Sequence, residues 1–317
     1  MPRAVDTENL RLDDAARAGW LYYIAGNTQE EIARKLAISR QSAQRLVALA
    51  VSERLVKVRL DHPIARCMDL AKALTDRYGL LYCDVTPSDP DSQSTTLGIA
   101  NAAAAEIERW LERKEPVVIA MGTGEEMRAT ANQLRPMVCP QHKLVSLVGN
   151  IAPDGSASLL DAVSRAADVV NAPHYPLPCP VIAASRAERD AMMASRHVRQ
   201  VVDLARSADV TFVGVGSMVE DAPLVRDGFV TLAEMRAMMA VGSAGEITSW
   251  AYDDAGEFIR GLTNDRAMGA QPVHDPSRLV IGVSIEPGRF RAISAALRGR
   301  LLTGLITNDL MAARLLA

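Results

Sequence analysis

Three glycine-bearing segments could bring backbone amides close to a bound molecule. They are Gly122, Thr123 and Gly124; Gly149 and Asn150; and Gly216. Each segment follows or ends an apolar run, and glycine there lets backbone N–H groups approach a ligand. A tight turn uses the same residues, so each segment also has a purely structural explanation. The carboxyl ends of parallel strands meet at one edge of a sheet, so together the three segments predict a shared cleft for a small molecule.

Short acidic and amide side chains could bind the hydroxyl groups of such a molecule. The candidates are Asn150, Asp161, Asp253, Asn264 and Asp309. For each of them a turn or a helix cap is an equally good explanation. Arg289 could contact the ligand or could be a surface charge paired with Glu286. The five histidines are scattered without the spacing of metal ligands, and we assign none of them a role.

A second kind of chemistry is concentrated near the N-terminus, in the sequence TQEEIARKLAISRQSAQRLV. Gln and Arg side chains can bond bidentately to adenine and guanine edges, and hydroxyl groups can contact phosphates. The candidate DNA contacts are Thr28, Gln29, Ser39, Arg40, Gln41, Ser42, Gln44 and Arg45. We expect Arg54, Lys57 and Arg59 to lie near phosphates.

The elements that would hold these side chains form a winged helix-turn-helix. Apolar residues at three- and four-residue steps predict a helix from Leu12 to about Ala25. Thr28 with Glu31 forms a capping box for a second helix, and Ser39 caps a third. The following LVKVRLDH alternates apolar and basic residues as a small β-wing does. Ala37 stands in the tight turn where glycine is usual, which predicts slight strain. An ordinary three-helix packing element is the alternative.

The rest of the chain alternates between aliphatic runs and helical patterns. The predicted strands are 80–85, 117–121, 143–149, 180–184, 210–216, 278–284 and 301–307. The predicted helices are 64–78, 97–113, 125–135, 158–170, 187–207, 231–240, 289–299 and 308–316. This pattern predicts an α/β fold with a mainly parallel sheet covered on both faces. We expect a DNA-binding domain over residues 1–62 and a ligand-binding domain over 63–317, with a connector helix within 63–80.

Composition agrees with this division. Residues 1–60 hold ten Lys and Arg against seven Asp and Glu, whereas the whole chain has a net charge of −3. A basic head on an acidic body is typical of a DNA-binding sensor. The four cysteines are far apart and support neither a disulfide framework nor a zinc site. No apolar run is long enough to be a signal peptide or to span a membrane, so we expect a cytoplasmic protein.

In this order and spacing the motifs resemble the SorC family of bacterial sugar-responsive transcription regulators. The resemblance rests on the N-terminal motif, MGTG, YPLPCPVIA, ADVTFVGVGSM, GSAGEI with the following Asp253-Asp254-Ala255-Gly256, and the ending RFRAISAALRGRLLTGLITNDLMAARLL. It is greatest with regulators of polyol catabolism, such as those for erythritol. It implies a sugar-isomerase-like (NagB/RpiA/CoA transferase-like) effector domain, operator DNA as a partner, a polyol or sugar phosphate as effector, and a homo-oligomer, a dimer or tetramer.

The resemblance also implies a way to hold phosphate. In members that bind phosphorylated sugars, the GTG turn and a lysine before the last-but-one helix contact the phosphate; these positions correspond to Gly122, Thr123, Gly124 and Arg289. Arginine still permits a phosphate contact. Glu125 and Glu126, however, open the helix behind the turn and would repel a phosphate there. We therefore expect an uncharged polyol, with a phosphorylated sugar as the alternative.

A sugar-phosphate isomerase-like enzyme is the alternative function, because the body of the chain would share that fold. Such an enzyme needs a positioned base but has no evident need for an N-terminal helix-turn-helix. We therefore expect a regulator of a carbohydrate or polyol catabolic operon, with no catalytic residue, no metal, no cofactor and no membrane partner.

Overall fold

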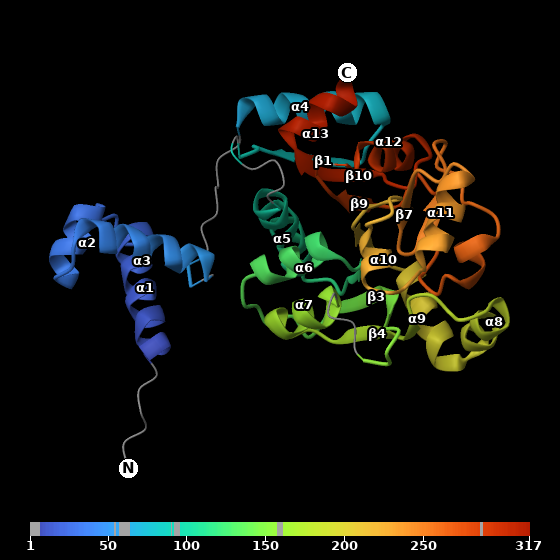
Figure 1. The fold of residues 1–317 in the computed structure, drawn as a ribbon, viewed down its shortest axis with the longest axis horizontal. Helices are drawn as coiled ribbons and strands as arrows, with labels where there is room; N and C mark the ends of the chain where they lie inside the picture. Colours follow the sequence, from blue (N-terminus) through green and yellow to red (C-terminus); the bar gives the residue numbers. More distant parts are fainter. Residues whose placement is uncertain are drawn as a thin grey trace, which may run out of the picture. The chain divides into compact units, whose positions relative to one another are not determined.

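The computed structural model describes residues 7–53, 55–56, 64–89, 91, 96–156, 161–285 and 288–317. The chain divides into two compact units, Met1–His62 and Pro63–Ala317, and each is described by itself (Figure 1). None of the helices in these ranges has both the length and the hydrophobicity needed to cross a bilayer. All four cysteines are free thiols, and three of them are buried.

The described residues of the first unit form three helices, α1 (Thr7–Tyr23), α2 (Gln29–Leu36) and α3 (Arg40–Ser52). The capping box of α2 is present, because Thr28 accepts a hydrogen bond from the Glu31 amide and the Glu31 carboxylate accepts one from the Thr28 amide. Ser39 caps α3 by accepting from the Ser42 amide. Ala37 has φ 53°, so the turn between α2 and α3 uses a left-handed alanine where glycine would be unstrained.

The helix predicted from Leu12 begins earlier, at Thr7, and packs closely on α3. A Cβ added to Gly19 would lie 2.7 Å from the Cβ of Ala50, so this contact requires glycine. Ala18, Ile32, Ala43 and Val47 are among the buried side chains of the small core. The predicted wing residues 57–62 and Arg54 lie outside the described residues.

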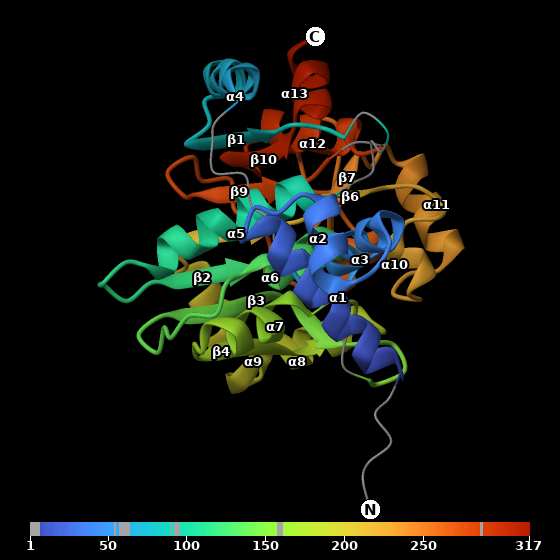
Figure 2. The ribbon, with the colours of Figure 1, turned by 90° about the vertical axis from the view of Figure 1, so that its left-hand side faces the viewer.

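The second unit is built on a parallel seven-stranded sheet, which confirms the predicted α/β class. Its strands, in spatial order, are β1 (Tyr82–Thr86), β10 (Gly304–Asn308), β9 (Val280–Val283), β5 (Val210–Val213), β2 (Val118–Met121), β3 (Lys143–Ile151) and β4 (His174–Pro180). Figure 2 looks onto this sheet, with β1 at the top and β4 at the bottom.

Helices cover both faces of the sheet. One face packs on α5 (Leu97–Leu111), α6 (Glu125–Gln133) and α7 (Ala162–Val170). The other packs on α4 (Ala65–Tyr78), α9 (Arg196–Arg206), α12 (Phe290–Arg298) and α13 (Asp309–Leu316). A small antiparallel sheet of β6 (Gly216–Ser217), β7 (Gly245–Ile247) and β8 (Trp250–Tyr252) joins the second face. The remaining elements are α8 (Arg186–Ala194), α10 (Pro223–Arg226), α11 (Leu232–Ala240) and the 3₁₀ helix η1 (Leu262–Arg266).

Three predicted elements are wrong in detail. The strand predicted over 180–184 is instead β4, which runs from His174 to Pro180. It contains three prolines, which a strand tolerates at the edge of a sheet, where β4 lies. The helix predicted over 187–207 is two helices, since Ser195 has extended backbone angles between α8 and α9. The strand predicted over 210–216 ends at Val213, and Gly216 belongs instead to the small antiparallel sheet.

Candidate functional site

A cavity of about 310 Å³ lies beyond the carboxyl ends of β2 and β5. This is the edge at which open α/β sheets bind ligands. Its walls are the turn 122–124, the first residues of α6, the segment 214–229 with α10, the tip of the β7–β8 hairpin, and Arg289. The Gly122 amide donates to the Phe212 carbonyl over 2.8 Å, which fixes the GTG turn beside β5.

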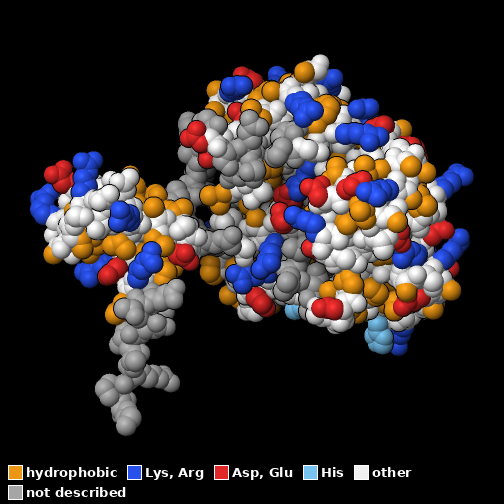
Figure 3. All heavy atoms as spheres, viewed as in Figure 1, with side chains coloured by type: hydrophobic (Ala, Val, Ile, Leu, Met, Phe, Trp, Pro, Cys, Tyr) orange, Lys and Arg blue, Asp and Glu red, His pale blue; other side chains and the backbone are white. Residues whose placement is uncertain are grey.

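Acidic side chains outnumber basic ones in the wall of this cavity. Its lining contains five carboxylates, Glu125, Glu126, Asp221, Asp227 and Glu246, and two guanidinium groups, Arg226 and Arg289. Figure 3 shows acidic and basic side chains side by side on the face of this unit that carries α6 and α10. The net charge of the lining is therefore negative when every carboxylate is ionised.

Both arginines are paired with carboxylates of α6. Arg289 forms an ion pair with Glu126, and the two side chains are only 21% and 6% exposed. Arg226 lies 3.6 Å from Glu125, and both of these side chains are mostly exposed. Water screens the buried pair little, although burial also lowers the pKa of Arg289 below its ordinary value. The exposed pair contributes little. The side chain best placed to hold a phosphate is thus already neutralised.

Glu246 is a wall residue that the sequence did not single out. Its Oε2 accepts a hydrogen bond of 2.8 Å from the Ser249 amide. Its Oε1 lies against Gly216: a Cβ added to this glycine would be only 2.1 Å from the Glu246 Oε1. Burial raises the pKa of Glu246 above its ordinary value, although the Ser249 amide opposes the shift. The motif GSAGEI drew attention to this segment, but only the pairing of β6 with β7 shows that Gly216 makes room for the carboxylate.

The tip of the β7–β8 hairpin also lines the cavity. Thr248 and Ser249 both have left-handed backbones, with φ of 53° and 71°. The Thr248 hydroxyl donates to the Ala270 carbonyl over 3.0 Å, which ties the tip to a neighbouring loop. Two successive non-glycine residues in this region are strained, and such strain is common at functional sites.

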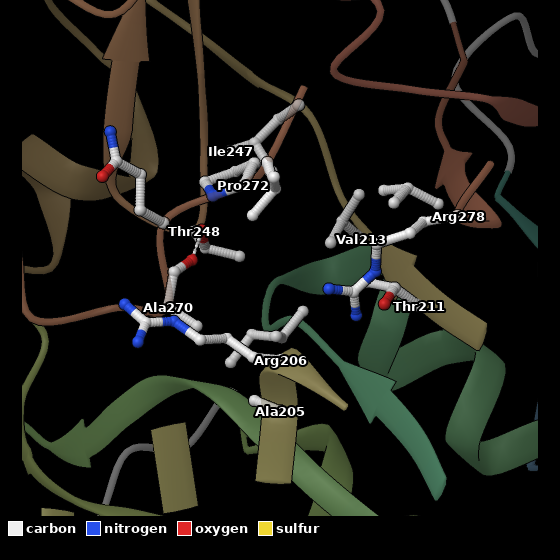
Figure 4. Close-up of a pocket in the computed structure, with 13 residues that line it drawn as sticks. Ala205, Arg206, Thr211, Val213, Ile247, Thr248, Ala270, Pro272 and Arg278 are labelled. Carbon is white, nitrogen blue, oxygen red and sulfur yellow. Dashed lines mark hydrogen bonds between the residues drawn. The ribbon is translucent and has the colours of Figure 1, made fainter. Parts of the chain in front are cut away.

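A second hollow shares Thr248 with the cavity (Figure 4). It is lined mainly by apolar side chains, and Arg206 and Arg278 lie at its margin. Its volume is about 40 Å³, which is enough for a water molecule but too little for a sugar. The larger cavity is therefore the candidate site. Within the described parts of the chain, no group of three or more His, Cys, Asp or Glu side chains is placed to hold a metal.

The structure brings half of the predicted effector contacts together. Gly122, Thr123, Gly124, Gly216 and Arg289 line the cavity. The others, Gly149, Asn150, Asp161, Asp253 and Asn264, are not among its lining residues, and neither is Asp309.

Several of these outlying residues have structural partners. Asp161 caps α7 by accepting from the Val163 and Ser164 amides. Asp253 accepts from two amides of its own turn. Asn264 exchanges hydrogen bonds with the backbone of Ala251. A Cβ at Gly149 would lie 2.2 Å from the Pro180 carbonyl oxygen, so this glycine permits the close approach of β4.

Seven of the eight candidate DNA contacts of the first unit fall into two groups, and the eighth, Gln29, is half-buried at the start of α2. Thr28 and Ser39 use their hydroxyls in caps, and Ser42 bonds to Ser39. In contrast, Gln41 and Gln44 are exposed on the first half of α3, as are Arg40 and Arg45. This half of the helix therefore presents side chains that can read base edges.

Comparison with known proteins agrees with this architecture. A family described as "Putative sugar-binding domain" matches residues 62–317. The erythritol catabolism regulatory protein EryD of Brucella abortus is 30% identical over 93% of each chain. The transcriptional regulator LsrR of an Enterobacter species is 28% identical over 95% of this chain and 92% of its own. The full-length sorbitol operon regulator SorC of Klebsiella pneumoniae, 23% identical, has the same fold with a TM-score of 0.71 over 96% of this chain and 99% of its own.

These relatives are named as regulators and extend over both units of the chain. The isomerase-like enzyme is thereby set aside, because an enzyme that shared only the α/β fold would match the second unit alone. The chain belongs to the SorC family of sugar-binding transcriptional regulators.

Proposed function

We propose that the cavity binds a small uncharged polyol, and that its occupancy controls the attachment of α3 to operator DNA. The observation that carries the proposal is the buried ion pair between Arg289 and Glu126. In a phosphate site this cation would be available to the ligand. Here a phosphate would have to displace a carboxylate that is nearly inaccessible to water and would leave that carboxylate unpaired.

The other carboxylates of the lining add to this cost. Two like unit charges about 5 Å apart repel by about 3 kcal/mol at an effective dielectric constant of about 20. The positive end of the α6 dipole, which would otherwise attract an anion, already faces Glu125 and Glu126. A neutral ligand avoids both effects.

A polyol suits the polar groups that remain. Its hydroxyls can donate to the Glu246 carboxylate and accept from Thr123 and from backbone amides of the GTG turn, all of which line the cavity. The volume of about 310 Å³ is at the lower end of ligand pockets, which favours a molecule of a few carbons. EryD, the relative at 30% identity, is named for the catabolism of erythritol, which is such a polyol.

Isothermal titration of the full chain with erythritol and with erythritol 4-phosphate tests the proposal directly. We expect the parent polyol to bind more tightly, with an affinity that changes little between low and high salt. The effector is a phosphorylated sugar instead if the phosphate ester binds ten times more tightly than the polyol. The same pair of titrations on Thr123→Ala checks the site, because loss of the hydroxyl should weaken polyol binding without unfolding the protein.

The same proposal includes the assembly. A helix-turn-helix recognises paired half-sites when two copies are related by a two-fold axis, so we infer a dimer or a tetramer. We assign base contacts to Gln41, Gln44 and Arg45, because they are exposed on the first half of α3.

A further inference from the structure

A stripe of exposed side chains runs along α1 on the side away from its packed face. The packed face contains Ala15, Ala18 and Gly19, all of them buried. The stripe consists of Leu10, Asp13, Arg17, Trp20 and Ile24, all of them exposed. Leu10, Trp20 and Ile24 are 50%, 55% and 67% exposed, and Figure 3 shows hydrophobic side chains at the surface of this unit. Three of these five side chains are large and apolar, and large apolar side chains gathered at a surface are typical of a contact with another protein.

The spacing of the stripe is that of a paired helix. Its members follow one another at alternating steps of three and four residues, which is the a and d pattern of a coiled-coil seam. Ile24 continues the pattern just beyond the end of α1, since its amide donates to the Trp20 carbonyl over 3.0 Å. Packing on α3 explains only the opposite face of α1. The stripe therefore calls for a second helix.

The charges in the seam select the direction of that helix. In a parallel pair, Asp13 would face Asp13 of a second copy and Arg17 would face Arg17, which is repulsive. In an antiparallel pair, a positions lie beside d positions, so Asp13 faces Arg17 of the second copy and Leu10 faces Trp20. Each of the four layers formed by Leu10, Asp13, Arg17 and Trp20 then joins opposite charges or two apolar side chains. In this register Ile24 lies opposite residue 6, which is outside the described residues.

We propose that α1 pairs antiparallel with α1 of a second copy of this chain, about a two-fold axis between Asp13 and Arg17. This pairing is separate from the ligand proposal, because it depends on neither the cavity nor DNA. The seam is short, so it adds modest stability to an assembly that other contacts bring together. Its consequence is a fixed spacing and orientation of the two α3 helices.

Cysteine cross-linking of the full chain tests the register. A disulfide requires Cα atoms within about 7 Å, whereas residue 10 and its own copy would be about 15 Å apart along the axis. We expect Leu10→Cys alone and Trp20→Cys alone to give no cross-link. A mixture of the two variants, refolded or co-expressed, should give a disulfide-linked species of twice the chain's mass. The unsubstituted chain controls for its own four cysteines.

Each other outcome contradicts the proposal. Cross-linking of Trp20→Cys with itself would show another register or a parallel pair. Absence of any cross-link in the mixture, with both variants melting like the unsubstituted chain, would show that the stripe packs elsewhere, for example on the second unit of the same chain.

Charge reversal separates a contact between copies from one within a helix, because Asp13 and Arg17 are also four residues apart on the same helix. Asp13→Arg in the Leu10→Cys copy, combined with Arg17→Asp in the Trp20→Cys copy, restores opposite charges only between copies. We expect this mixture to cross-link as well as the parent mixture. Asp13→Arg in both copies should abolish the cross-link, and equal yields from the two mixtures would refute an antiparallel pair.

Discussion

At the scale of single residues, the proposed function makes the charge of Glu126 the main determinant of which ligands the cavity holds. The carboxylate opens α6 and is bonded to Arg289, so the guanidinium is not available to an anion. A neutral side chain of the same shape would keep the contact with Arg289 and leave the positive charge of the guanidinium unpaired. We therefore expect a single oxygen-for-nitrogen exchange to change the preference between a polyol and its phosphate.

Glu126→Gln should therefore change the selectivity of the site. We expect the phosphate ester to gain about tenfold in affinity, or about 1.4 kcal/mol, while the parent polyol changes little. Calorimetry with both ligands measures the change. Glu125→Gln is the matched control, since Glu125 is exposed and pairs only loosely with Arg226. An equal effect of the two substitutions would mean that the buried pair has no special role.

Glu246 should make stability depend on pH. Burial raises its pKa in the folded protein above the ordinary 4.5. At a pH between the unfolded and the folded pKa, the folded protein therefore keeps a proton that the unfolded chain releases. Stability is then greatest below pH 4.5 for this group and falls as pH rises through its folded pKa. We expect Glu246→Gln to melt higher than the parent at pH 7 and to lose the difference toward pH 4. A constant difference across this range would rule out the titration.

At the scale of elements, the first half of α3 should determine operator preference. Gln44→Ala should cost about 1–3 kcal/mol on the preferred sequence and relax the preference at one base pair. Gel-shift assays on a set of operator variants measure both effects. Ser52→Ala, at the other end of α3, should leave the preference unchanged. Uniform weakening on all sequences would reassign Gln44 to a phosphate contact.

Elements with local signals could be predicted from the sequence. The capping box of Thr28 and Glu31, the cap at Ser39 and the strained turn at Ala37 are all present, because each depends on residues only a few positions apart. The parallel sheet followed from its aliphatic runs. The position of β4 could not be predicted well from the sequence, because its three prolines argue against a strand. They are tolerated because β4 lies at the edge of the sheet, which the local sequence does not reveal.

Contacts between segments that are distant in the sequence could not be predicted from local sequence patterns. The GTG turn and Arg289 were found because each lies next to a recognisable strand or helix. Glu246 was missed because its position depends on Gly216, thirty residues away, through the pairing of β6 with β7. Asp161 and Asn264 have residue types suited to a sugar, but their hydrogen bonds go to the backbone and, for Asp161, also to the Ser164 hydroxyl.

At the scale of the whole molecule, the proposed assembly brings two α3 helices to DNA. We expect most of the contact between copies to come from the second unit and from α4, on which Met68 is 56% exposed. Light scattering at micromolar concentration should show a dimer or tetramer, with or without effector. Met68→Asp should lower the mass, and Asp69→Ala, at the next and also exposed position, should not. A monomeric parent chain would contradict the proposed assembly.

The left-handed tip formed by Thr248 and Ser249 has a consequence for the response of the gene. Each residue stores about 1–3 kcal/mol of backbone strain in the structure described here. Any conformation that relaxes the tip is easier to reach by that amount, and about 1.4 kcal/mol corresponds to a tenfold change in the ligand concentration needed to move such an equilibrium. We expect these two backbone angles to contribute to the ligand concentration at which operator binding changes. Thr248 and Ser249 both line the cavity, so glycine at either position would relax the strain and would also remove a side chain from the cavity wall.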